Sequence, residues 1–345
     1  MVVYFIWRAI RDARGFEVMQ RVSVIVLNYN GAHLLPDCVE SLLAQDYSHL
    51  EILVVDNASV DESERTIQKY PGVRWLGLPS NEGLGPGYNA GAKTARGNLL
   101  FFVNNDTRFE PDCVRHLVKA FQDDQVLAAD PLQMDWNGSQ VIHGAQRFRR
   151  GWRYLFRAVP LMEPYQDLKM SRETEVPWGC AGALMFERRK FEALGGFDPT
   201  FFLDYEDVDI CWRGWLRGWK TLFVPAARLR HRVGESEDSL LRRHNPTLRT
   251  QPLLAINNRR RLSQLKNAQR FVLKNMPWSL ALLALGVNLL QIAGAFLFGR
   301  FSQGLNRIKA AVLNSRELGQ ILAQRRQIQQ GVSISRLALL KRRWE

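Results

Sequence analysis

From Arg21 onward, short apolar runs alternate with segments of helical periodicity, and three of these runs end in polar residues. The runs are RVSVIVLNYN at 21–30, LEILVVDNAS at 50–59, VRWLGL at 73–78 and LLFFVNNDT at 99–107. Helical patterns follow over 34–43, from near Asp61, after the glycine-rich NEGLGPGYNAGAKTA, and up to about Phe121. This alternation predicts an α/β fold with a mostly parallel sheet, right-handed crossovers and helices on its faces.

The fourth run has the strongest pattern of a buried strand. Five apolar residues precede Asn104, Asn105 and Asp106, as expected for a central strand covered on both faces. Ligands of open α/β sheets bind beyond the carboxyl ends of such strands. Oxygen ligands at this position suit a divalent cation that holds a phosphate. The alternative is that these three residues belong to a loop that leaves the sheet and binds nothing.

After the fourth run the pattern becomes irregular and then recovers. Hydrophobic residues in 133–175 follow neither a helical nor a strand period. This segment contains RFRRGWRYLFR, whose aromatic rings are suited to stacking on a sugar or touching lipid. A short strand and helices from about Glu187 and Glu206 follow. The sheet pattern ends near His231, and we expect one domain over 21–249.

Residues 250–345 are predicted to be helical and basic. The segment 278–298 has 21 residues without a formal charge, which is long enough to cross a bilayer. Basic residues flank it on both sides, so charge does not select an orientation, and a helix or helical hairpin in the membrane interface is favoured. The alternative is a buried core helix. Residues 1–20 are predicted to be a disordered or membrane-touching leader.

Charge and cysteine content narrow the class of partner and compartment. The net charge is +13, but 25 Lys and Arg face only 5 Asp and Glu from Ile210 to Glu345. Because this charge gathers beside the apolar segment, we expect an anionic membrane surface and not a nucleic acid as its partner. Four well-separated cysteines indicate free thiols in a reducing compartment.

The glycine-rich segment does not match the usual nucleotide-binding loops. Gly83-Leu-Gly-Pro-Gly-Tyr88 lacks the last glycine of GxGxxG, and the chain contains no GxxxxGK[ST]. We therefore interpret these glycines as letting the backbone approach a ligand, with Asn81 and Asn89 offering amides.

Six motifs, in order, resemble those of the family 2 glycosyltransferases with the GT-A fold. They are SVIVLNYNG, VVDNASVD, NEGLGPGYNAG, FVNNDT, GCAGALMFERRKFEALGGFDPTFF and YEDVD. The resemblance is greatest to the bacterial rhamnosyltransferase-like branch, and it extends over roughly residues 22–231. It does not identify the sugar.

The resemblance implies a nucleotide-sugar donor site and a Mg²⁺ or Mn²⁺ ion. Asp106 matches the last carboxylate of the family's DxD motif, while Asn104 replaces the first one and weakens the site's charge. His231 lies where some relatives place a further metal ligand; a structural histidine is the alternative. The expected donor-binding residues are Asn28, Tyr29, Asn30, Asp56, Asn57, Asn81, Gly83, Asn89, Asn104 and Asn105.

Glu206 and Asp207 resemble the ED motif, whose aspartate is the general base of an inverting transfer. Such a base must reach the acceptor hydroxyl on the side opposite the leaving group. The alternative is a pair of acids favoured by the helix dipole at a first turn. The expected acceptor-side loop contains Trp178, Gly179, Cys180 and Gly182.

Together these features predict an inverting, metal-dependent glycosyltransferase that moves one sugar, rhamnose being a candidate. The expected donor is dTDP-, UDP- or GDP-linked, and the expected acceptor is a lipid-linked saccharide in cell-surface polysaccharide synthesis. We expect peripheral or monotopic attachment at the cytoplasmic face of the bacterial inner membrane. One alternative is a processive polysaccharide synthase, although no QxxRW motif follows the ED motif. The other is a non-catalytic scaffold that binds nucleotide sugar or lipid.

Overall fold

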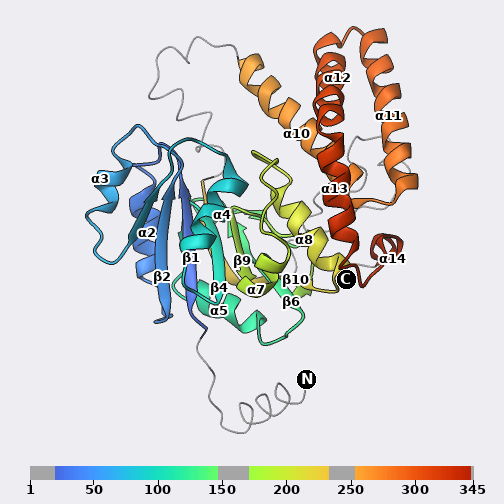
Figure 1. Ribbon diagram of the computed structural model, residues 1–345. Coiled ribbons are helices and arrows are strands. Elements are labelled where there is room, and N and C mark those ends of the chain that lie inside the picture. Colours follow the sequence, from blue (N-terminus) through green and yellow to red (C-terminus); the bar gives the residue numbers. More distant parts are fainter. Residues whose placement is uncertain (1–19, 147–170, 233–252, 343–345) are drawn as a thin grey trace.

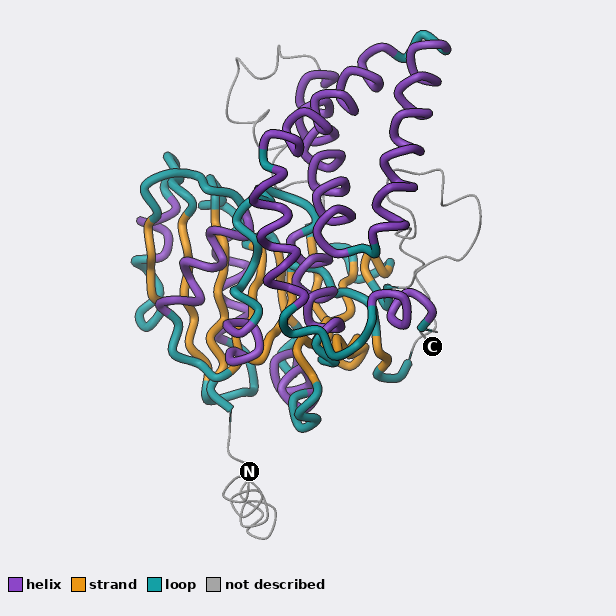
Figure 2. The backbone as a smooth tube through the Cα atoms, turned by 45° about the vertical axis from the view of Figure 1, so that its right-hand side comes forward, coloured by secondary structure: helices purple, strands orange, loops and turns teal. Residues whose placement is uncertain are grey.

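The computed structural model describes residues 20–146, 171–232 and 253–342 (Figure 1). The predicted leader at 1–19, the RFRRGWRYLFR segment and the end of the predicted sheet domain at 233–249 lie outside these residues. The described part folds as a central sheet with helices on both faces and a group of helices at its C-terminal end (Figures 1 and 2).

The first half of the sheet is parallel, as predicted. The order β3-β2-β1-β4 places the first strand in the middle, with each neighbour running in the same direction. These strands are β1 (Val22–Asn28), β2 (Leu50–Asp56), β3 (Arg74–Gly77) and β4 (Leu99–Asn104). Their polar ends therefore meet at one edge.

The second half of the sheet is mixed, so the expectation of a mostly parallel sheet is wrong there. β9 runs antiparallel to both β4 and β6, and β5 runs antiparallel to β10. Because β9 is antiparallel to both of its neighbours, it does not continue the parallel βαβ arrangement of β1 to β4. The strands of this second half are β5 (Thr107–Phe109), β6 (Val126–Met134), β7 (Val141–His143), β8 (Thr174–Glu175), β9 (Ala183–Glu187) and β10 (Lys220–His231).

Helices cover both faces of the sheet and create two apolar cores. Phe101 of β4 points into the core beneath α2 and α5, while its neighbour Phe102 points into the core beneath α4 and α7. This alternation explains why the strand is apolar at every position. The helices are α2 (Leu35–Leu43), α3 (Ser63–Ile67), α4 (Leu84–Thr94), α5 (Cys113–Ala120), α7 (Arg188–Ala193) and α8 (Glu206–Leu216).

The C-terminal region is helical, as predicted, and it packs on α8 through a third apolar core. Trp212 and Trp215 of α8 lie against Phe271 and Met276 in this core. The helices are α10 (Leu253–Asn275), α11 (Trp278–Leu297), α12 (Phe301–Arg316), α13 (Leu318–Gln329) and α14 (Arg336–Lys341). Helices α11 and α12 form a hairpin that extends away from the sheet (Figure 1).

Helix α11 is the one helix of the described residues that is long and apolar enough to cross a membrane. Only 22% of its most apolar 18-residue window is buried. A core helix of a water-soluble domain would be covered on most sides, so that alternative does not describe α11.

Candidate functional site

The polar ends of three adjacent strands form one hydrogen-bonded row. Asn28 of β1 is in register with Asp56 of β2, and Leu27 is in register with Asn104 of β4. Asn105 Nδ2 donates to Asn28 Oδ1 at 2.7 Å, and Asn28 Nδ2 donates to Asp56 Oδ1 at 2.8 Å. This row fixes the Asp56 carboxylate at the carboxyl edge of the sheet, where ligands of open α/β sheets bind.

Ser59 completes this edge, although the sequence patterns did not identify it. Its backbone N–H donates to Asp56 Oδ2 at 2.9 Å, and its hydroxyl oxygen accepts from the Asn30 backbone N–H at 2.8 Å. The only available signal was its spacing of three residues after Asp56, which permits such a turn. Tyr29 lies beside this edge with a relative exposure of 36%, so its ring is accessible.

Asn57, Asn81 and Gly83 form a second layer of the same edge. Asn57 Nδ2 donates to Asn81 Oδ1 at 2.9 Å, and the Gly83 N–H donates to the same oxygen at 3.1 Å. Gly83 has φ +93°, and a Cβ there would lie 2.5 Å from the carbonyl oxygen of Phe202. Glycine is thus required by packing against the segment that precedes α8.

Asn89 has a different position from the one expected. Its amide donates to the Phe197 carbonyl at 2.8 Å and its oxygen accepts the Phe197 N–H at 3.0 Å. Both ends of the side chain are therefore used to join α4 to the loop after α7. This pairing makes Asn89 a structural link between α4 and that loop, and its role in donor binding stays a prediction.

Asp106 and His231 approach each other at the end of the sheet. His231 Nε2 lies 3.0 Å from Asp106 Oδ1, and both Asp106 oxygens are buried without a hydrogen-bond partner among the described residues. Gln133 Oε1 lies 2.9 Å from His231 Nδ1 and can only accept, so Nδ1 carries a proton. If a divalent cation bound here, Nε2 would present its lone pair to the ion and Asp106 its carboxylate, so the pair would supply two ligands.

This pair fits a divalent ion that also takes ligands from a bound diphosphate. Within the described residues, no group of three or more His, Cys, Asp or Glu side chains is arranged to hold a metal. Asn104, the neutral replacement in the DxD position, accepts a hydrogen bond from the Tyr88 hydroxyl through Oδ1 at 3.0 Å. Asp106 and His231 are therefore the two candidate metal ligands that the described residues offer at this edge.

Glu206 and Asp207 begin α8 directly after a strained turn. Asp204 and Tyr205 have φ values of +69° and +79°, which side chains other than glycine rarely adopt. Asn267 of α10 donates to the carbonyl oxygens of Leu203 and Asp204, each at 2.9 Å. The C-terminal region thus supports the turn that presents the two carboxylates.

The two carboxylates differ in their hydrogen bonds and charge. Burial raises the pKa of Asp207 to about 6, although backbone N–H groups of Ala181 and Val208 lower it by donating at 3.0 and 2.7 Å. Burial, and then the charge of Asp207, raises the pKa of Glu206 well above its usual value. Its Oε2 has no hydrogen-bond partner among the described residues. Asp207 is therefore the carboxylate that ionises near neutral pH, and Glu206 stays protonated.

The expected acceptor-side loop connects these carboxylates to the Asp106–His231 pair. Ala181 binds Asp207, and a Cβ on the next residue, Gly182, would lie 3.2 Å from His231 Cε1. Trp178 is buried in the second core, and burial raises the pKa of the Cys180 thiol to about 12. The loop therefore presents backbone and small groups, while Trp178 serves packing and the Cys180 thiol stays protonated.

Comparisons with known proteins identify the class and then the family. The crystal structure of GalNAc-T7 with UDP, GalNAc and Mn²⁺ matches 74% of this chain and 48% of that chain, with a TM-score of 0.56 and 21% identity. This likeness and the sheet order define a GT-A fold. The model of glycosyl transferase family 2 matches residues 23–195, half of the chain. The chain therefore belongs to glycosyl transferase family 2, as its motifs predicted.

Two relatives differ in how much of their length they share. N-acetylglucosaminyl-diphospho-decaprenol L-rhamnosyltransferase of Mycobacterium tuberculosis is 27% identical over 237 residues, which cover 62% of this chain and 77% of the relative. An uncharacterised glycosyltransferase of Nostoc sp. is 33% identical over 111 residues, which cover 31% of this chain and 34% of the relative. The chain thus spans about a third of the Nostoc protein.

Proposed function

We propose that this protein is an inverting, metal-dependent glycosyltransferase that moves one sugar from a nucleotide sugar to a lipid-linked saccharide. The observation that carries this proposal is a buried carboxylate, Asp207, whose pKa is raised to about 6 and which lies one loop away from a buried Asp–His pair. A carboxylate whose pKa lies just below neutral pH is ionised at neutral pH and is suited to accept a proton from a hydroxyl group.

The strand-end row is the proposed binding site for the nucleotide. Asn28 and Ser59 hold the Asp56 carboxylate in place by hydrogen bonds. This carboxylate can accept hydrogen bonds from a base or ribose, and Tyr29 offers a ring for stacking. Asp106 and His231 would hold Mg²⁺ or Mn²⁺. When bound, this ion would stabilise the negative charge that develops on the departing diphosphate.

The transfer step uses Asp207 as the general base. The acceptor hydroxyl gives its proton to Asp207 while its oxygen forms a bond to the anomeric carbon. The bond from that carbon to the diphosphate oxygen breaks, with its electron pair leaving on the nucleoside diphosphate. One displacement inverts the anomeric configuration, so this mechanism requires no carboxylate nucleophile.

The proposed acceptor is lipid-linked because of the exposed apolar hairpin and one relative. The Mycobacterium tuberculosis relative is named for a lipid-linked N-acetylglucosamine acceptor and for transfer of L-rhamnose. On α11, Leu289 and Leu290 are each 67% exposed, which is unfavourable in water and favourable in a membrane interface. We propose attachment at the cytoplasmic face of the bacterial inner membrane.

A donor panel tests this proposal directly. Full-length protein is incubated with dTDP-, UDP- and GDP-sugars, a polyprenyl-diphospho-sugar acceptor and Mg²⁺ or Mn²⁺, and nucleotide release is measured. We expect release with one donor class that depends on acceptor and is abolished by a chelator. NMR of the product should show an inverted anomeric centre.

A matched pair of variants separates the metal site from general effects. Asp106→Asn should raise the metal concentration needed for half-maximal release at least about ten-fold, because it removes the one carboxylate of the pair. Asp123→Asn is the control, since this carboxylate pairs with Lys220 outside the proposed site. Donor binding without release on any acceptor would instead favour a non-catalytic scaffold, and product chains of many added sugars would favour a processive synthase.

A further inference from the structure

Two arginines bind the C-terminal end of α10, where the chain passes into α11. Arg325 of α13 is 3% exposed, and its Nη1 donates to the carbonyl oxygen of Leu273 at 2.7 Å. Arg336 of α14 donates through Nε to the carbonyl oxygen of Asn275 at 2.7 Å. Both carbonyls belong to the last turn of α10, where cations are favourable, so the two guanidinium groups cap the same helix end.

Capping uses only part of the two guanidinium groups. Arg325 Nε and Arg336 Nη2 are buried and have no hydrogen-bond partner among the described residues. An arginine carries a full positive charge at physiological pH, whereas a helix end carries about half a charge. Two arginines at one helix end thus leave a surplus of positive charge, and burying such charge without a counter-ion is costly.

The C-terminal helices hold almost no acid that could neutralise this surplus. Residues 253–342 contain 15 Lys and Arg and one acid, Glu317. Glu317 pairs with Arg270 at 2.5 Å and with Lys266 at 3.6 Å. A counter-ion for the two capping arginines would therefore have to come from the sheet domain or from a ligand.

The acid of the sheet domain that reaches this end of α10 is already paired. Asp209 Oδ1 accepts from the Asn275 side chain at 2.7 Å. The same carboxylate also binds Lys274 at 2.7 Å and Arg213 at 2.7 Å, so its charge is neutralised by two other cations. The surplus charge of the capping arginines thus has no acidic partner among the described residues.

The first turn of α11 adds unpaired N–H groups at the same place. Helix α11 begins at Trp278, directly after Pro277, and no side chain caps it. First-turn N–H groups have no acceptor within a helix, so this end of α11 also favours an anion. The guanidinium carbon of Arg325 lies 4.1 Å from the centroid of the Trp278 ring. A buried, incompletely bonded cation and the positive end of α11 therefore meet here.

Exposed apolar side chains continue from this place along α11. Trp278, Leu282 and Leu283 are all exposed. Tryptophan is typical of the interface between membrane and water, where lipid headgroups lie, and arginine can bind a phosphate through two parallel hydrogen bonds. A free phosphate ion needs no apolar surface, whereas a phospholipid joins a phosphate to acyl chains. The surroundings therefore favour a lipid phosphate over a free ion.

We propose that Arg325, Arg336 and the first turn of α11 bind the phosphate group of a membrane phospholipid, whose acyl chains lie along the exposed leucines of α11. This inference rests on the membrane attachment in the proposed function and assigns a specific headgroup site to it. A phosphate bound there would also join α10, α11, α13 and α14.

A short-chain phospholipid tests this site without a membrane. Full-length protein is titrated with short-chain phosphatidylglycerol below its micelle-forming concentration, in the presence of a chelator, and thermal unfolding is followed. Inorganic phosphate at equal ionic strength is the comparison. A ligand of the folded state raises Tm, and we expect the phospholipid to do so at a concentration at least about ten-fold lower than inorganic phosphate.

Neighbouring arginines of α13 supply a matched pair of variants. Arg325→Gln should raise the half-maximal phospholipid concentration at least about ten-fold, because charged hydrogen bonds to the phosphate are lost. Arg326→Gln removes the same charge from the next residue, whose side chain is exposed, and should change that concentration by less than about two-fold. Arg336→Gln, at a half-buried position, should act as Arg325→Gln does and keeps the test valid if Arg325→Gln does not fold.

The outcomes separate this inference from the proposed function. A wild-type Tm that the phospholipid does not raise overturns the site, and so do equal half-maximal concentrations in the variants at 325, 336 and 326. A wild type that responds equally to inorganic phosphate overturns the assignment to a lipid. Failure of the wild type to bind vesicles or to release nucleotide overturns parts of the proposed function instead. The titration contains neither vesicle nor donor, so it reports on the site separately.

Discussion

At the residue scale, the two neighbouring carboxylates of α8 are expected to respond differently to the same chemical change. Asp207→Asn removes the group that accepts the proton and should lower kcat by about 10²- to 10⁴-fold. Glu206→Gln replaces a group that is already neutral, because burial raises its pKa, so its loss should be at most about ten-fold. Nucleotide release under saturating donor measures both, and equal losses would contradict the division of roles.

The position of the strand-end residues could be predicted, because each comes directly after an apolar run in the sequence. Asn28, Asp56 and Asn105 each follow an apolar run, and the register of a parallel sheet brings such ends together. The structural contact of Asn89 could not be predicted, because its partner, Phe197, is distant in sequence. Asp130 of β6 and His143 of β7, whose Oδ2 and Nε2 lie 2.7 Å apart, could not be predicted for the same reason, because their contact depends on the pairing of β7 with β6.

At the element scale, α10 is expected to matter for catalysis although it carries none of the predicted site residues. Asn267→Ala removes both hydrogen bonds to the strained turn before Glu206 and leaves two carbonyl groups without that partner. We expect a loss of about 1–3 kcal/mol in the free energy of unfolding and a lower kcat, because the turn can relax and displace Asp207.

Chemical denaturation and kcat measured on the same sample test this expectation. Gln264→Ala, an exposed position one turn earlier on α10, is the matched control and should change neither quantity appreciably. A variant at Asn267 that loses stability but keeps the full kcat would show that the turn holds its shape without α10.

The elements that the sequence did not reveal are those with polar residues or proline inside a strand. β6 contains Asp130 and Pro131, which interrupt its apolar pattern, and β10 contains Pro225, near which its register with β6 shifts. Proline removes a ladder hydrogen bond, and a buried carboxylate reads as a polar position. Strands β1 to β4 contain no proline, and their runs were predicted even though β2 carries the buried Glu51 near its start.

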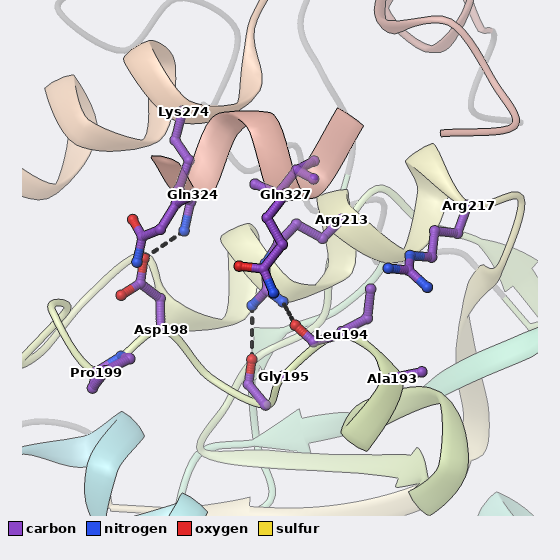
Figure 3. Close-up of a pocket in the computed structure, with 12 residues that line it drawn as sticks. Ala193, Leu194, Gly195, Asp198, Pro199, Arg213, Arg217, Lys274, Gln324 and Gln327 are labelled. Atoms are coloured by element: carbon purple, nitrogen blue, oxygen red, sulfur yellow. Dashed lines mark hydrogen bonds and ion pairs between the residues drawn. The ribbon is translucent and has the colours of Figure 1, made fainter. Parts of the chain in front are cut away.

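At the scale of the whole molecule, a buried ion cluster joins the sheet domain to the C-terminal helices. Lys274 of α10 lies 2.6 Å from Asp198 and 2.7 Å from Asp209, and all three side chains are buried. Lys274 and Asp198 line a pocket of about 180 Å³ between the loop after α7, α10 and α13, and none of the predicted site residues line it (Figure 3). These ion pairs hold α8, which carries the proposed base Asp207, against α10.

Lys274→Met should therefore destabilise the fold by about 3–5 kcal/mol, because it removes the cation that two buried carboxylates share and leaves Asp209 with Arg213 and Asp198 with the more distant Arg270. Burial raises the pKa of Asp198, but Lys274 and Thr200 outweigh burial and hold it well below its usual value. Asp198 thus contributes stability above about pH 4 that is lost as pH falls further. Thermal unfolding should show the largest difference from wild type at neutral pH and a smaller one in acid. Lys309→Met, exposed on α12, should show neither effect.

The hairpin of α11 and α12 provides the last prediction, which concerns membrane attachment. Leu289→Glu/Leu290→Glu places two charges on the exposed apolar side of α11. Each buried leucine contributes about 1.5–3 kcal/mol on leaving water, so the double variant should lower partition to vesicles by at least about 100-fold. Leu43→Glu on α2 is the control, because Leu43 is also exposed, at 52%, but lies in the sheet domain.

Co-sedimentation with anionic and neutral vesicles measures the apolar and the electrostatic contributions to membrane binding. Binding should be stronger to anionic vesicles and weaken with salt, because Arg300 and Lys309 flank the apolar surface. If the hairpin variant bound as well as wild type, attachment would have to reside in another part of the chain, and the exposed leucines of α11 would need a protein partner instead of lipid.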